Sequence, residues 1–146
     1  MKTKPKKRLL LFLFTLILVI IVGCNNASPT IKEVKLQELN NGAKIFVDTI
    51  KNNNGVYLYS REDDKQYLIV NYSNVLQGEE ALFLDSINAQ VMDRTLKIHI
   101  EELGTTDYQD KRLNNIRVFN LSSTQEYEKI KIYKNGKETR FDSVGG

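Results

Sequence analysis

Hydrophobic side chains at helical spacing mark residues 41–51. The positions that follow the i, i+3, i+4, i+7 pattern are Ala43, Phe46, Val47 and Ile50. This spacing places all four on one face of a helix, with Asn40 or Asn41 as its N-cap. The Asn-Asn-Asn-Gly run that follows is typical of a helix end, because Asn and Gly tolerate the left-handed conformation. Three of the four side chains also favour strands, so an extended segment is the alternative.

Beyond residue 55 the hydrophobic period changes from that of a helix to that of a strand. Alternating apolar and polar positions predict strands at residues 56–60, 66–72, 81–91, 95–101, 115–121, 129–133 and 138–144. Polar turns separate several of these segments. Asn135-Gly136 is the strongest hairpin signal, because both residue types accept the positive φ of a type I′ turn.

These elements predict a single α+β domain, mainly β, over residues 31–146. We expect an antiparallel sheet or a small sandwich of six to seven strands, with the one helix covering an open face. A chain of 146 residues is long enough for one domain of ordinary size and too short for two.

The first residues follow a different pattern. Five basic side chains lie among the first eight residues, and an apolar run interrupted only by Thr15 fills residues 9–22. As a helix this run would be about 21 Å long. That length is short for a bilayer core of about 30 Å and typical of the central part of a secretory signal.

The chain after these first eight residues has 16 basic and 18 acidic residues, which argues against a nucleic-acid partner.

Ile21-Val22-Gly23-Cys24 ends the apolar run and resembles the lipobox of bacterial lipoproteins, although that family most often has Leu where this chain has Ile21. The resemblance implies that the Cys24 thiol takes a diacylglyceryl group and that a signal peptidase cuts between Gly23 and Cys24. Residues 1–23 would then be the signal peptide, and acyl chains such as palmitate would hold the new N-terminus in the membrane. An uncleaved signal anchor and a secreted protein cut elsewhere are the alternatives.

Residues 24–30 would carry the lipidated cysteine and a tether. The segment is polar, contains Ser28-Pro29 and has no periodicity. Its six residues after Cys24 reach at most about 20 Å. We therefore expect a lipid-anchored domain on the extracytoplasmic face of the cell membrane. The richness in Lys, Asn and Ile and the short tether favour a Gram-positive bacterium.

The order of helix, paired strands, longer strands and closing hairpin resembles the C-terminal domain of the protease complex subunit PrcB. The segments that carry this resemblance are residues 45–50, 54–57, 67–70 and 95–102. That family has a Thr-Gly-Gly-Tyr-type turn after its second strand, where this chain has Gln77-Gly78-Glu79-Glu80. The resemblance implies a small extracytoplasmic module and assigns no functional residue.

Residues that carry enzyme and metal chemistry are few. Cys24 is the only cysteine and His99 the only histidine, which excludes an internal disulfide and a multi-histidine metal centre. His99 alternates with isoleucines, so we expect it on the strand face opposite the core. Asp107 and Asp110 share a loop that could offer oxygen ligands to calcium, but the loop lacks the alternating Asp ladder of a known calcium site. We expect no enzyme activity, no cofactor and no metal.

Tyrosines supply the candidate binding residues. Tyr57 and Tyr59 share one face of a predicted strand, and exposed tyrosines offer flat amphipathic area to a peptide or a glycan. The alternative is that Tyr simply suits strands. Free sheet edges are a second candidate surface, because an extended partner segment can add a strand to them.

Taken together, these patterns predict a non-enzymatic, membrane-anchored lipoprotein. We expect its β-rich domain to bind or scaffold another extracytoplasmic protein. The alternative is a lipoprotein that binds a small ligand or cell-wall glycan through an exposed face containing Tyr57 and Tyr59.

Overall fold

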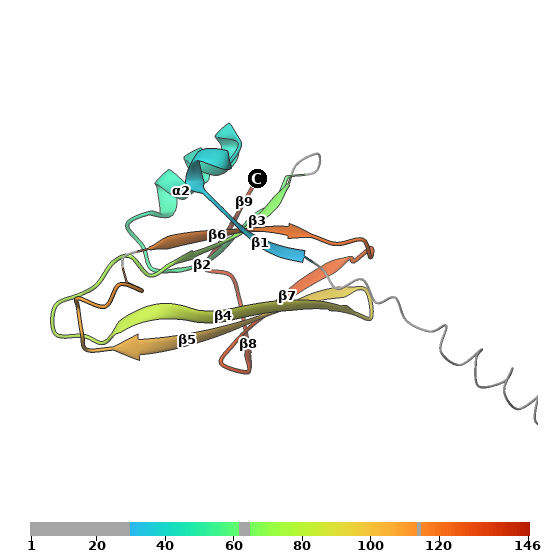
Figure 1. The fold of residues 1–146 in the computed structure, drawn as a ribbon. Coiled ribbons are helices and arrows are strands. Elements are labelled where there is room, and N and C mark those ends of the chain that lie inside the picture. The colour runs from blue at the N-terminus through green and yellow to red at the C-terminus, as the bar shows by residue number, and fades with distance from the viewer. Residues whose placement is uncertain (1–29, 62–64, 114) are drawn as a thin grey trace, which may run out of the picture.

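The computed structural model describes residues 30–61, 65–113 and 115–146. They form two stacked sheets with one α-helix on the outside of the first sheet (Figure 1). The strand order is β1-β6-β3-β2-β9 in the first, sheet A, and β4-β5-β7-β8 in the second, sheet B. The predicted α+β, mainly β architecture with one covering α-helix is confirmed. The predicted signal peptide, Gly23, Cys24 and the tether up to residue 29 lie outside the described residues.

The strands of the two sheets differ in length. Sheet A contains β1 (Thr30–Val34), β2 (Gly55–Tyr59), β3 (Gln66–Asn71), β6 (Ile116–Ser122) and β9 (Ser143–Gly145). Sheet B contains β4 (Ala81–Met92), β5 (Thr95–Thr105), β7 (Lys129–Lys134) and β8 (Lys137–Thr139). The helices are η1 (Leu36–Glu38), a 3-10 turn, and α2 (Asn41–Ile50). The described residues thus form nine strands rather than six to seven, because β1 was not predicted and the last predicted strand is divided.

Helix α2 forms where the hydrophobic spacing predicted it, so the extended alternative is wrong. The Asn40 side chain caps its start by accepting a hydrogen bond of 2.7 Å from the Ala43 amide. The buried helix residues are Ala43, Val47 and Ile50. At the other end, the amide nitrogen of fully buried Asn71 lies 2.8–3.1 Å from the carbonyl oxygens of Ile50, Lys51 and Asn53. Asn71 therefore binds the end of α2 to strand β3.

The single strand predicted over residues 138–144 is wrong. Asn135 and Gly136 have the positive φ values of 47° and 78° expected of the hairpin turn, but β8 ends at Thr139. The chain then crosses to sheet A, where β9 pairs parallel with β2. Asp142 holds this crossing: its amide donates to the Val56 carbonyl at 2.8 Å, and its carboxylate accepts from the Val56 amide at 2.7 Å.

The predicted antiparallel pairing holds for five of the strand pairs among the described residues and fails for two, β2 with β9 and β5 with β7. Strand β7 pairs parallel with β5, from Thr95 opposite Lys129 to Ile100 opposite Lys134. The intervening strand β6 lies in sheet A between β1 and β3. Because the chain visits the other sheet and returns, β7 runs in the same direction as β5. Both sheets are therefore mixed.

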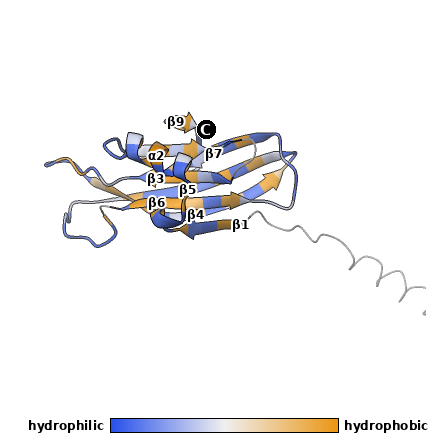
Figure 2. Ribbon diagram, turned by 90° about the horizontal axis from the view of Figure 1, so that it is seen from above, coloured by the Kyte–Doolittle hydropathy of each residue, from blue (hydrophilic) through white to orange (hydrophobic). Residues whose placement is uncertain are grey.

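Two apolar layers hold these elements together. The larger layer fills the space between the sheets, and its fully buried members include Leu68, Leu96, Ile98 and Ile100. The smaller layer lies between α2 and sheet A, around Val47, Ile69 and Val118. Apolar and polar positions alternate along many of the strands (Figure 2). No helix among the described residues covers the outer face of sheet B (Figure 1).

Candidate interaction surfaces

Tyr57 and Tyr59 share one face of β2, but that face is the one covered by α2. Their exposed fractions are only 4% and 3%, and both belong to the apolar layer under the helix. The alternative of an exposed tyrosine face is therefore wrong. The strand pattern identified the shared face of the two rings correctly but did not indicate that the helix packs on it.

Their surroundings explain the burial. The Phe46 ring of α2 packs against both tyrosine rings, with centroid distances of 6.5 Å to Tyr57 and 5.9 Å to Tyr59. A Cβ atom on Gly42 would lie 2.3 Å from the Tyr59 hydroxyl, so glycine allows the helix to approach the ring. The Tyr57 hydroxyl donates to the Asn53 carbonyl at 3.0 Å, and burial raises the pKa of Tyr57. Both tyrosines thus hold α2 on the sheet.

His99 lies on the outer face of sheet B, opposite the core-directed isoleucines, as predicted. It is half-buried because its ring stacks on Tyr133, at a centroid distance of 4.8 Å and an interplanar angle of 10°. The neighbouring Glu138 carboxylate accepts hydrogen bonds from Tyr133 at 3.3 Å and from Lys131 at 3.0 Å. The Nε2 atom of His99 is enclosed and has no hydrogen-bond partner among the described residues. Nε2 therefore makes no hydrogen bond to a described Ser, Thr or Cys side chain.

The loop with Asp107 and Asp110 is organised by ion pairing and turns. Asp110 forms a two-pronged ion pair with Arg112, whose Nη2 atom lies 2.6 Å from a carboxylate oxygen. The guanidinium holds the pKa of Asp110 down, at about 2. Asp107 accepts from the Gln109 amide at 3.0 Å. Within the described parts of the chain, no group of three His, Cys, Asp or Glu side chains is placed to hold a metal ion.

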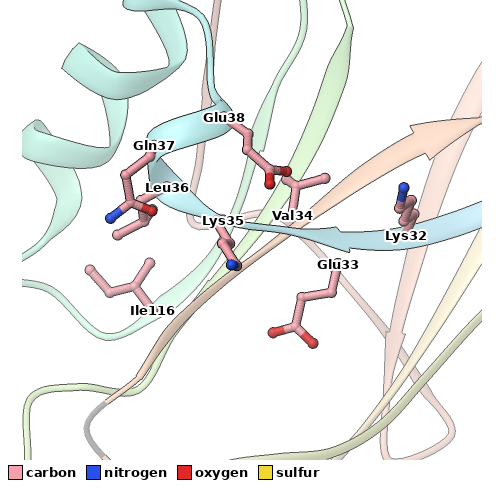
Figure 3. A pocket seen from close by; sticks show the side chains of 8 residues that line it. All are labelled: Lys32, Glu33, Val34, Lys35, Leu36, Gln37, Glu38 and Ile116. Atoms are coloured by element: carbon pink, nitrogen blue, oxygen red, sulfur yellow. The ribbon is translucent and has the colours of Figure 1, made fainter.

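An open hollow of about 540 Å³ lies beside β1 and η1 (Figure 3). It is lined by Lys32, Glu33, Val34, Lys35, Leu36, Gln37, Glu38 and Ile116. Figure 3 shows that the charged ends of Lys32, Glu33 and Glu38 point in different directions rather than toward one point. Glu33 is instead bound by Arg117, at 2.8 Å. The hollow therefore lacks the converging polar groups of a small-ligand site.

Sheet edges are the most distinctive open surface. Strand β4 is the longest strand among the described residues and lies at an edge of sheet B, paired only with β5. Its second half, residues 86–92, contains no charged residue, proline or glycine. The lack of charged residues, proline and glycine is visible in the sequence, but only the strand order shows that this segment lies at an edge.

Comparisons with known proteins add no assignment. No family model, curated protein or solved structure matches this chain. Among residues 30–61, 65–113 and 115–146, no helix has the length and hydropathy needed to cross a bilayer. The functional conclusion is therefore based on the residues of this chain and their geometry.

Proposed function

We propose that this chain is a lipid-anchored, extracytoplasmic, non-enzymatic module that binds protein. The observation that carries the proposal is the order of three features at the N-terminus: five basic residues, the apolar run at residues 9–22, and Cys24. Strand β1 begins at Thr30, only six residues beyond that cysteine. The anchor would therefore keep the sandwich within about 20 Å of the lipid surface.

Anchoring also accounts for the single cysteine. Each buried methylene contributes about 0.8 kcal/mol, and one acyl chain alone binds a membrane only marginally, so a diacylated Cys24 is a sufficient anchor where a single chain is not. A cysteine that carries lipid through its sulfur cannot act as a nucleophile or a metal ligand. The chain's only thiol would therefore serve attachment and not catalysis.

Protein binding is the activity that the described surface supports best. Sheet B has an outer face that no described helix covers and a long edge strand with an uncharged half (Figure 1). Both features suit an extended, flat contact with another polypeptide. The small-ligand or glycan alternative relied on exposed Tyr57 and Tyr59, and their burial under α2 removes its support.

Metabolic labelling with a clickable fatty acid tests the anchor. We expect label in the wild-type chain and none in Cys24→Ala, because that sulfur is the only attachment point in the proposal. Ser28→Ala is a matched control within the tether and should keep its label. Mass spectrometry of the mature wild-type chain should find modified Cys24 as its first residue. Label that persists in Cys24→Ala, or a mature chain that begins at Met1, would overturn the proposal.

A further inference from the structure

The edge strand β4 consists of two unlike halves, divided by a bulge between Leu84 and Ser86. Before the bulge, two arginines contact the strand. The Arg112 guanidinium lies 3.9 Å from the centre of the Phe83 ring, and Arg117 donates to the Leu84 carbonyl at 3.3 Å. After the bulge, residues 86–92 pair with β5 on one side, and no described residue hydrogen-bonds to their backbone on the other side.

Other sheet edges are protected in ways that this segment is not. Strands β8 and β9 have three residues each, which is too short to template much pairing. Strand β1 has five residues, among them exposed Lys32 and Glu33, and charges on an edge oppose the addition of a strand. Residues 86–92 have neither protection. A long, uncharged, open edge is a predicted pairing site.

The two faces of this segment define what can pair with it. Ile87, Ala89 and Val91 lie opposite Ile100, Ile98 and Leu96 of β5 and join the apolar layer between the sheets. Ile87 and Val91 are only half-buried, so each has apolar surface that an added strand would cover. Asn88 and Gln90 are exposed on the other face. The partner strand must therefore be apolar on one face and polar and uncharged on the other.

The segment itself has this pattern when it is reversed about Ala89. In an antiparallel pair centred there, Ile87 of one copy would lie opposite Val91 of the other, and Asn88 opposite Gln90. Apolar side chains then meet apolar ones, amides meet amides, and no charge meets a charge. We infer that residues 86–92 pair with the same residues of a second copy, joining two four-stranded sheets into one sheet of eight strands across a two-fold axis.

This dimer is compatible with the anchor, a step that rests on the proposed function. A two-fold axis between antiparallel edge strands is perpendicular to the sheets, so the two copies of Thr30 lie at equal height on opposite ends of the joined sheet. Both tethers reach one membrane if the sheets lie parallel to it. Packed sheets are about 10 Å apart, and the six tether residues span up to about 20 Å.

Cross-linking of the full chain in its native membranes tests the geometry. In the inferred register, the two copies of Gln90 are diagonal neighbours about 7–8 Å apart. Gln90→Cys should therefore give a dimer with a short bismaleimide. Lys97 lies opposite Gln90 on β5, so in each copy it is one strand further from the two-fold axis. The distance between the two copies of Lys97 is therefore longer by two strand spacings of about 4.8 Å each. Lys97→Cys is the matched control and should give none, and the wild-type chain shows whether Cys24 itself reacts.

Charge variants test the pairing without touching the core, because both side chains are exposed. N88K/Q90K places two lysines opposite each other on each side of the axis and should weaken the dimer roughly tenfold, as measured by mass photometry in mild detergent. N88K/Q90E places lysine opposite glutamate and should restore it.

The outcomes separate the dimer from the anchor. Equal dimer fractions in N88K/Q90K and wild type, a monomeric wild type, or Gln90→Cys joined to a different polypeptide would each overturn the inference. A fatty-acid-labelled chain that is monomeric contradicts the dimer and leaves the anchor standing. An unlabelled chain that dimerises through this edge contradicts the anchor and supports the dimer.

Discussion

Sheets A and B bury their strands differently. In β2 every residue is buried, and in β3 every residue but the first, because α2 covers one face of sheet A and sheet B covers the other. In β5 of sheet B, burial alternates along residues 95–100, because only the inner face is covered. A strand covered on both sides needs a nearly continuous apolar run, whereas a strand covered on one side keeps a polar position at every second residue. Tolerance to substitution should therefore differ between the sheets.

The largest expected effect is in the doubly covered sheet. Ile69 is fully buried under α2, so Ile69→Ala should lower the free energy of unfolding by about 3–4 kcal/mol through lost burial and the cavity left behind. Urea denaturation measures this loss. Lys97→Ala, on the outer face of β5, is the control and should change stability by less than about 0.5 kcal/mol. Equal losses would contradict the distinction between the two sheets.

Removal of the Asn71 side chain tests how α2 is fixed to sheet A. Asn71→Ala removes one donor from each of three carbonyls at the helix end, and each of them keeps one other donor. We therefore expect the free energy of unfolding to fall by about 2 kcal/mol. Amide hydrogen exchange should accelerate more in α2 than in sheet B. Asn74→Ala, a half-buried neighbour that also donates to the Lys51 carbonyl, is the control and should have a small effect. Uniform acceleration in both sheets would argue against a local role.

A bond between the residue that follows β3 and strand β5 gives a smaller effect that depends on pH. The buried Tyr72 hydroxyl donates to Glu102 of β5, and Glu102 also pairs with Lys134 at 3.3 Å. Tyr72→Phe keeps the aromatic ring and the Glu102–Lys134 ion pair and removes only the hydroxyl. It should therefore lower the free energy of unfolding by about 1 kcal/mol near pH 7.

Burial and the Glu102 bond raise the pKa of Tyr72 well above its ordinary 10.0. The resulting stabilisation is complete below pH 10 and is lost as the pH rises further, because the unfolded tyrosine ionises while the folded one does not. The stability of the wild type should thus fall more steeply above pH 10 than that of Tyr72→Phe, as followed by denaturation at several pH values. Parallel curves would show that Tyr72 does not carry this dependence. Tyr57 and Tyr127, with raised pKa values of their own, remain in both proteins.

The smallest effect should come from the uncovered face of sheet B. His99→Ala removes a ring that stacks on Tyr133 and forms no hydrogen bond through Nε2. We expect a loss below about 1 kcal/mol, with Tyr133→Ala as the matched partner variant. Thermal melts of the two single variants and the double variant would measure the coupling between the rings. A loss as large as that of Ile69→Ala would show that this face is packed against something beyond the described residues.

Local patterns in the sequence identified most of the elements and the turns. The i, i+3, i+4, i+7 spacing located α2, and Asn135-Gly136 located the last hairpin, because helix amphipathicity and turn conformation depend on residues close together in the chain. The same is true of His99, whose face follows from alternation with its neighbours. These features need no information about distant segments.

Long-range packing decided the rest. Tyr57 and Tyr59 alternate with Val56 and Leu58 as they would in a strand with one solvent-exposed face. Only the packing of α2 on that face buries it. The parallel pairing of β7 with β5 and the open edge of β4 depend on which sheet each strand joins, which no local pattern encodes. The sequence by itself determined the helix, most of the extended segments and the hairpin turn at Asn135-Gly136, but it missed β1 and the division of the last strand. The tertiary structure alone decided which faces are buried and which edge stays open, because burial depends on contacts between segments far apart in the chain.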